Sequence, residues 1–469
     1  MGKYKYLIKN MGLMTISNFA SKLLSFLLVP LYTAVLTTDE YGTYDLYTTT
    51  AFLLMPIFSV CIAEAVMRFT LDKKNDTKEV FSIGFSIYVK ACCIMVILIV
   101  LNYALDIIHI FNQYPVYFVL YFCLCLLSGL LSQFAQGLEK IFDVAISGIL
   151  SSATIVSLNI LLLVVFPHGL SGYFISNCAA FGVVSIYLIV RLKIWKYFSL
   201  RICKDLKSDM TNYSFPLVLS QIGWWINNVS DRYVVTWLCG ATANGIYSVA
   251  YKIPAILNVF QTIFSQAWTL STVREIDEKN SDFYTVVYRC YNCGMVVICS
   301  LLIASNKIIA TILFSNDFYV AWKYAPFLVI SVVFGALSEV FNGIFTATKN
   351  SKITARTTLL GASVNTILNI VLVYFFGPLG AAVSTLISYI AVWSIRMSVA
   401  KRLVVINIKL VRDIASYVIL ILQSILLFID MKINGDTVQL LLFIVLLSLY
   451  IQDIKSVFWR MKRKHTVNN

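Results

Sequence analysis

The chain has 469 residues, of which 59% are hydrophobic and only 13% are charged. A soluble domain is about 45–50% apolar and about 25% charged, so this composition excludes a soluble enzyme, a disordered chain and a secreted disulfide scaffold. The net charge of +14 is compatible with nucleic-acid binding in principle. The distribution of the basic residues indicates orientation in a membrane instead, and we expect no nucleic-acid partner.

The apolar stretches predict an all-α polytopic membrane protein. A membrane-crossing helix needs about 20 apolar residues, and lipid offers no partner to unpaired backbone groups, so about fourteen transmembrane helices are expected. The predicted spans are Met11–Leu36, Tyr41–Met67, Val80–Ala104, Pro115–Gln136, Phe142–Phe166, Gly169–Val190, Tyr213–Leu238, Ala243–Leu270, Phe283–Ala304, Tyr324–Ala347, Ile353–Phe376, Gly377–Ala400, Lys409–Phe428 and Val438–Ile454. The connections are too short for a folded domain of about 50 residues, so binding chemistry is expected within the helices or at their ends.

Basic residues fall almost entirely on one side of these spans. Of the 37 Lys and Arg residues, 29 lie in or beside the connections on the side of the N terminus, and three (Lys307, Lys323 and Lys432) lie on the opposite side. Cytoplasmic connections of membrane proteins are enriched in Lys and Arg. The pattern therefore predicts a cell-membrane protein with both termini in the cytoplasm.

Neither the cysteines nor the glycines indicate a cofactor. The sequence has 11 Cys and three His, and its one C-x-x-C pair, Cys290 and Cys293, lies in an apolar stretch. Such cysteines are typical of buried packing and not of a metal site. No G-x-x-x-x-G-K-[ST] motif is present, so we expect no ATP hydrolysis, no cofactor and no enzyme activity.

A faint internal repeat divides the chain into two similar halves. Gly42-Thr43-Tyr44 aligns with Gly245-Ile246-Tyr247, Leu158-Asn159-Ile160 with Leu368-Asn369-Ile370, and Gly169, Gly172 and Ser176 with Gly377, Gly380 and Ser384. The repeat predicts two pseudo-symmetric six-helix lobes, residues 1–200 and 201–404, followed by helices 13 and 14 and a basic cytoplasmic tail in residues 405–469. Parallel repeats of this kind are a common transporter plan, with the binding site between the lobes.

Polar and charged residues within the spans are the candidate binding residues. Ionisable groups in a bilayer are costly, so they face protein or water and often mark a transport path. Several recur at helical spacing and so share a face, as Asn18 and Lys22 do in the first span. The candidates are Asn18, Lys22, Arg68, Asn227, Asp231, Arg232, Ser248, Lys252, Arg289, Glu339, Asn365 and Asn369.

Structural roles are open for several of these residues. Arg68 lies four residues after Glu64, which is the spacing of an intrahelical ion pair. Arg289 can extend to the inner headgroups. Asp231 and Arg232 can make a structural contact near the outer end of their helix, and the Asn and Ser residues can bind neighbouring helices. Lys22 and Lys252 lie deeper, so we predict that they bind the anionic part of a substrate.

The chain resembles bacterial polysaccharide-unit flippases of the Wzx type, in the multidrug/oligosaccharidyl-lipid/polysaccharide exporter superfamily. The resemblance is carried by Ser17-Asn18-Phe19, Leu28-Val29-Pro30-Leu31-Tyr32 and Glu40-Tyr41-Gly42 in the first half, and by Asp231-Arg232-Tyr233, Gly245-Ile246-Tyr247 and Ala250-Tyr251-Lys252 in the second. In the related lipid II flippases, cationic residues on the first, second and eighth helices bind the diphosphate. Lys22, Arg68 and Lys252 match by helix.

The resemblance implies alternating access through a cationic cavity. The implied cargo is an undecaprenyl-diphosphate-linked oligosaccharide, moved from the inner to the outer leaflet of the bacterial cell membrane for O-antigen, capsule or exopolysaccharide assembly. H⁺ or Na⁺ is a candidate coupling ion, and a polysaccharide polymerase complex is a candidate partner. One alternative is a cation-coupled multidrug antiporter of the same superfamily. Another is a membrane glycosyltransferase or polymerase, and the short outer connections argue against this second alternative.

Overall fold

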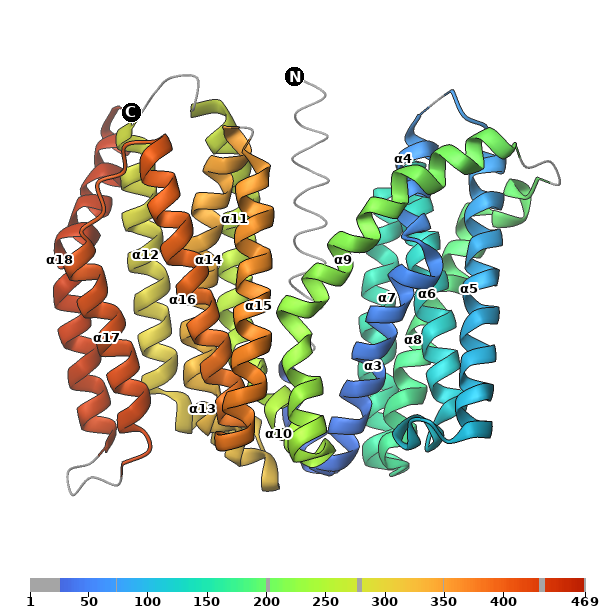
Figure 1. The fold of residues 1–469 in the computed structure, drawn as a ribbon, viewed down its shortest axis with the longest axis horizontal. Coiled ribbons are helices and arrows are strands. Elements are labelled where there is room, and N and C mark those ends of the chain that lie inside the picture. The colour runs from blue at the N-terminus through green and yellow to red at the C-terminus, as the bar shows by residue number, and fades with distance from the viewer. Residues whose placement is uncertain are drawn as a thin grey trace. The chain divides into compact units, whose positions relative to one another are not determined.

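The computed structural model describes residues 26–72, 74–199, 203–275, 281–348, 350–429 and 435–467. Within these ranges every regular element is a helix (Figure 1). Nine helices in the described ranges are long and apolar enough to cross a membrane, or ten if the bent pair α3 (Thr38–Ser59) and α4 (Ile62–Leu71) is counted as one span. The chain is therefore a multi-pass membrane protein, and the predicted fold class is confirmed.

A helix occupies each predicted span from the second onward. Besides α3 and α4, they are α5 (Thr77–Leu105), α6 (Pro115–Gly137), α7 (Ile141–Asn159), α8 (Gly169–Leu192), α9 (Lys204–Cys239), α10 (Ala241–Ala250), α11 (Lys252–Glu275), α12 (Ser281–Ala304), α14 (Ala325–Ala347), α15 (Ser351–Phe376), α16 (Pro378–Leu403), α17 (Leu410–Leu426) and α18 (Gly435–Val467). Of the first predicted span, the described part contains α2 (Val29–Val35). The arrangement is consistent with fourteen spans.

Five short helices, or helix extensions, supplement the spans. They are η1 (His109–Asn112), η2 (Ile160–Val165), η3 (Ile194–Tyr197), α13 (Asn306–Leu313) and η4 (Asn316–Lys323). The extension η2 continues α7 as a π-helix. The α13–η4 pair forms the connection between α12 and α14.

The second predicted span is broken where two residues adopt left-handed backbone. Thr37 caps the start of α3, because its hydroxyl accepts from the Glu40 amide while Glu40 accepts from the Thr37 amide. At the other end Val60 and Cys61 have φ of 52° and 51°. An L residue cannot continue a right-handed helix at positive φ, and the axis turns by 55° between α3 and α4.

The chain divides into two compact units, Met1–Val229 and Ser230–Asn469. The boundary falls within α9, whereas the predicted lobes divide at residue 200, ahead of that helix. In the first unit, buried side chains from α4, α5, α6 and α8 form one core that includes Val66, Phe81, Phe134 and Leu188. An aromatic group lies beside this core, where Tyr173 of α8 contacts the rings of Tyr32 and Tyr44.

In the second unit α14 is the central helix. It packs against α11, α12, α16 and α17. Its side chains are buried nearly all round, as Leu328, Val333 and Phe341 illustrate. A helix whose side chains are mostly apolar and buried has little surface for water, which explains its place at the centre of the unit. The last two helices, α17 and α18, pack on α12 (Figure 1).

The internal repeat is visible in matched backbone geometry. Gly169 and Gly377 both have positive φ, 54° and 59°, at the turns before α8 and α16. Three residues later, a Cβ on Gly172 would lie 2.8 Å from the Leu162 carbonyl oxygen, and one on Gly380 would lie 2.1 Å from that of Leu372. Both glycines therefore allow a close helix–helix approach that no other residue permits.

Two polar positions follow the same repeat. Asn159 and Asn369 are wholly buried, as are Ser176 and Ser384. Each serine hydroxyl donates to a carbonyl of its own helix, so its polar group is satisfied internally. The agreement in burial and backbone geometry confirms that the two halves are pseudo-symmetric.

Candidate functional site

The second unit holds a buried arginine that sequence reasoning missed. Arg396 of α16 is 4% exposed. Its Nε donates to the Thr357 hydroxyl at 3.0 Å, and Nη2 donates to the Thr358 hydroxyl at 2.9 Å. Its Nη1 lies 3.5 Å from Glu339 Oε1 and 3.4 Å from the Ser338 carbonyl oxygen. Four partners from α14 and α15 thus fix the guanidinium in place.

The predicted residue Glu339 is the accessible end of this group, which we call the Arg396 network. Its side chain is 37% exposed, against 5% for that of Arg396. The second carboxylate oxygen accepts from Asn342 Nδ2 at 3.0 Å, and Asn342 Oδ1 accepts from the Thr354 hydroxyl at 2.6 Å. A charge buried without a partner would be very costly, so the Glu339 carboxylate offsets the cost of burying the Arg396 guanidinium.

Asp231 is the centre of a second group, the Asp231 cluster, at the junction of α9 and α10. The carboxylate is buried and accepts from the Tyr247 hydroxyl at 2.6 Å and from the Tyr251 hydroxyl at short range. It also accepts from the Arg232 amide at 3.0 Å. The Arg232 guanidinium carbon lies 5.2 Å from the centre of the Tyr251 ring, a cation–π contact. Asp231 and Arg232 are thereby brought together with two tyrosines.

Lys252 begins α11, directly after this cluster. The helix is interrupted at Tyr251, and Pro254 has no amide hydrogen to donate to the preceding turn. Lys252 is half-buried, and no hydrogen bond or ion pair joins it to another described residue. One turn earlier, the Ser248 hydroxyl donates to Asn244 Oδ1 at 3.3 Å, and both residues are buried. Asn244, Ser248 and Lys252 are spaced four residues apart, and Lys252 is the available cation among them.

Helices α14 and α16 approach each other closely at Gly335, because the Tyr389 ring of α16 lies 3.1 Å from where a Cβ on Gly335 would stand.

The asparagine pair of α15 faces α16. Asn369 Nδ2 donates to Asn365 Oδ1 at 2.9 Å, and Asn365 Nδ2 donates to the Thr385 hydroxyl at 3.3 Å. Asn369 Oδ1 is buried and accepts no hydrogen bond from the described residues. The two predicted residues are therefore brought together with a threonine of the neighbouring helix.

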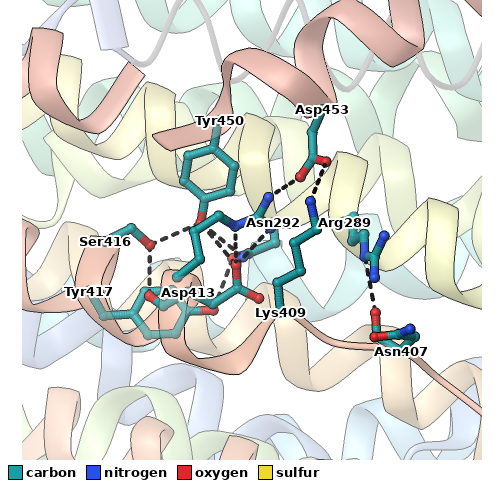
Figure 2. Close-up of polar contacts among 10 residues, drawn as sticks. Arg289, Asn292, Asn407, Lys409, Asp413, Ser416, Tyr417, Tyr450 and Asp453 are labelled. Carbon is teal, nitrogen blue, oxygen red and sulfur yellow. Dashed lines mark hydrogen bonds and ion pairs between the residues drawn. The ribbon is translucent and has the colours of Figure 1, made fainter. Parts of the chain in front are cut away.

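Arg68 and Arg289 take part in none of the hydrogen bonds of these groups in the described structure. Arg68 is exposed on α4, and no ion pair joins it to Glu64 in the described structure. The Arg289 Nε donates to the Asn407 carbonyl oxygen at 3.0 Å and holds the α16–α17 connection against α12 (Figure 2). Asn18 and Lys22 lie outside the described residues, as does the side chain of Asn227.

A third polar group, the C-terminal seam, joins α12, α17 and α18 (Figure 2). Arg412 pairs with Asp413 at 2.8 Å and at short range with Asp453, and it lies 4.4 Å from the centre of the Tyr450 ring. Asn292 Nδ2 donates to the Tyr450 hydroxyl at 3.1 Å. The seam explains how two helices with polar inner faces attach to the unit in lipid, where interhelical hydrogen bonds replace hydrophobic association.

Comparison with known proteins places the chain in a family. A family profile described as "Polysaccharide biosynthesis protein" matches residues 7–269, more than half of the chain, and one described as "MatE" matches residues 216–371. The chain belongs to the polysaccharide biosynthesis protein family. The family predicted from the sequence is thereby confirmed.

A curated relative and two solved structures extend the comparison. The "Probable low-salt glycan biosynthesis flippase Agl15" of Haloferax volcanii is 25% identical over 186 residues, and the match spans 39% of each protein. The lipid II flippase MurJ in an inward closed conformation has a TM-score of 0.69 at 16% identity, with 95% of this chain and 98% of that chain covered. An inward-facing MATE family transporter of the MOP superfamily has a TM-score of 0.66 at 12% identity, with 81% and 96% covered. These likenesses establish the fold.

Proposed function

We propose that the chain is a flippase that moves an undecaprenyl-diphosphate-linked oligosaccharide from the inner to the outer leaflet of a bacterial cell membrane. The proposal includes alternating access, cytoplasmic termini, and use of the unit in O-antigen, capsule or exopolysaccharide assembly. Family membership supports it, and so do the flippases among the relatives, Agl15 and MurJ. Transport, and not catalysis, is the activity that such relatives share.

The charge of the second unit is the structural observation that supports this cargo. Glu339 is paired with Arg396, and Asp231 is surrounded by two tyrosine hydroxyls and the neighbouring Arg232. Lys252 has no such partner in the described structure. The Asp231 cluster, the Arg396 network and Lys252 together carry an excess of positive charge, which suits a diphosphate.

Substitution of Lys252 tests the proposal. The Lys252→Ala variant should lose surface-polysaccharide production in a complementation assay while its membrane level stays unchanged. Lys252→Arg, which keeps the charge, should retain part of the activity. The matched control is Lys401→Ala, which removes an exposed lysine near the end of α16 and should complement normally. Normal polymer from Lys252→Ala would rule out this binding role.

A cation-coupled multidrug antiporter is the second candidate function. The MatE profile match and the buried carboxylate of Asp231 favour it. Under this alternative Asp231→Asn would abolish drug efflux by cells, and Lys252→Ala would leave polysaccharide production intact. Under the flippase proposal, H⁺ or Na⁺ serves as the coupling ion, and a polysaccharide polymerase complex receives the flipped unit.

A further inference from the structure

Two lysines converge on one tryptophan in the connection between α12 and α14. Lys307 of α13 has its Nζ 4.8 Å from the centre of the Trp322 indole, and Lys323, which ends η4, has its Nζ 5.9 Å from the same centre. The indole also contacts the ring of Phe428, with centres 5.3 Å apart. The face of an aromatic ring attracts a cation, so both lysine ammonium groups are drawn to the ring of Trp322.

In the part of the chain that the structure describes, no carboxylate pairs with either lysine. Within the described residues neither lysine takes part in an ion pair, and Asp317, the acidic residue of η4, is exposed and unpaired with both. Two like charges at one ring repel each other, and an anion bound between them would remove that repulsion. Lysine ammonium groups bind phosphate as point charges. The two lysines therefore have the chemistry expected of a phosphate-binding site.

The adjacent helix presents an apolar surface. Ile308 and Ile312 of α13 are 58% and 67% exposed, and their spacing of four places them on one side of the helix. The Asn306 side chain donates to the Trp322 carbonyl oxygen at 2.8 Å. This hydrogen bond fixes the start of α13 against the backbone of Trp322. Cations and an indole beside exposed aliphatic side chains are typical of a segment at the membrane–water interface.

The predicted orientation places this segment at the outer leaflet. Lys307 and Lys323 are two of the three basic residues expected on the outer side. Positive charge is sparse on that side of membrane proteins, so a focused pair there needs its own explanation. Neither repulsion of a substrate nor attraction of lipid in the cytoplasmic leaflet explains a pair of lysines on the outer side.

We propose that Lys307, Lys323 and Trp322 bind the phosphate of an anionic phospholipid in the outer leaflet. Ile308 and Ile312 contact the first segments of its acyl chains. The bound lipid holds the α13–η4 connection at the interface while the helices on either side move. Only the choice of leaflet depends on the proposed orientation, because the binding chemistry is the same in either leaflet.

Trp322 fluorescence tests the site directly. The full-length protein is placed in nanodiscs that contain either phosphatidylglycerol or phosphatidylcholine with brominated acyl chains, which quench nearby tryptophans. The signal of Trp322 is the difference between the native chain and Trp322→Phe. Brominated phosphatidylglycerol should quench this signal at least twofold more strongly than phosphatidylcholine, and high salt should reduce the difference.

Lysine variants supply the decisive comparison. Lys307→Gln/Lys323→Gln should lose the preference for phosphatidylglycerol, and Lys307→Arg/Lys323→Arg should keep it. The matched control, Lys140→Gln/Lys196→Gln, removes two exposed lysines of the first unit and should keep it as well. Equal quenching by both lipids, or a preference that survives Lys307→Gln/Lys323→Gln, would overturn the proposal. Release of the lipid by a substoichiometric isoprenyl diphosphate would also overturn it, because the site would then belong to the transported product.

Discussion

Arg396 and Glu339 form an ion pair between α16 and α14 in which one partner is buried and the other is not. The Arg396 side chain is 5% exposed and the Glu339 side chain is 37% exposed, with 3.5 Å between Nη1 and Oε1. The arginine is further held by two threonine hydroxyls of α15. The pair therefore holds the Glu339 carboxylate at an accessible position of the second unit.

Removal of the Arg396 charge should destabilise the second unit. Arg396→Gln removes the hydrogen bonds that the charged guanidinium donates to Thr357 and Thr358, and each such hydrogen bond contributes about 1.5–3 kcal/mol. Arg396→Lys should lose part of that stability, because a lysine lacks the planar fork that reaches several partners. Denaturant unfolding in detergent measures the effect. Arg402→Gln, at an exposed position of the same helix, should change stability by less than about 0.5 kcal/mol, and an equal loss in both variants would refute the role of the pair.

The close approach at Gly172 should tolerate no side chain. A Cβ there would lie 2.8 Å from the Leu162 carbonyl oxygen, which is backbone and cannot move aside cheaply. Gly172→Ala should therefore lower the yield of folded protein, and Gly380→Ala should do the same in the second half, where the clash is at 2.1 Å. Gly182 lies on the same helix as Gly172 with no atom within 4 Å of its Cβ position, so Gly182→Ala is the control. It should stabilise by up to about 1 kcal/mol, and similar yields from Gly172→Ala and Gly182→Ala would contradict the argument.

The helical spans and the repeat could be predicted from the sequence, because lipid imposes apolar length and internal hydrogen bonding. The turn glycines Gly169 and Gly377 were correctly matched, since positive φ favours that residue type. The break at Val60 and Cys61 could not be predicted. Neither residue type prefers left-handed backbone, so the surrounding tertiary contacts determine the conformation there.

The candidate site was only partly predictable. Sequence spacing identifies Glu339, Asp231 and Lys252, but Arg396, near the inner end of the predicted span Gly377–Ala400, does not stand out from the basic residues that follow it. A charge within the last two turns of a helix can extend to the headgroups or turn inward, and only the packing of α14 and α15 around it decides. For Arg289 the sequence allows an extension to the inner headgroups. In the structure its Nε donates to the backbone of the α16–α17 connection.

The tyrosine hydroxyls around Asp231 should stabilise its carboxylate. Tyr247→Phe/Tyr251→Phe removes two donors to a buried charged acceptor, and each such hydrogen bond contributes about 1.5–3 kcal/mol. In an Asp231→Asn background the same pair of substitutions should cost much less, so a double-mutant cycle on unfolding free energy measures the coupling. Tyr374→Phe, at a position that is 75% exposed, should be neutral. Additive effects of the tyrosine and aspartate substitutions would show that the cluster is not coupled.

The stability of the C-terminal seam should depend more on Arg412 than on Asp413 or Asp453 alone. Arg412→Met leaves Asp413 wholly buried beside the Tyr450 hydroxyl, without the cation that pairs with it in the described structure, and such an uncompensated charge costs about 3–5 kcal/mol. Asp453→Asn should cost less, because Arg412 still pairs with Asp413. Limited proteolysis of the membrane-embedded protein at residues 404–409 reads out the detachment of α17, since Arg289 and Thr285 bind that connection to α12. The double variant Arg412→Met/Asp413→Asn should restore protection from cleavage, because it removes the buried charge together with its partner. Cleavage of the double variant as fast as that of Arg412→Met alone would show that this pair does not hold the seam.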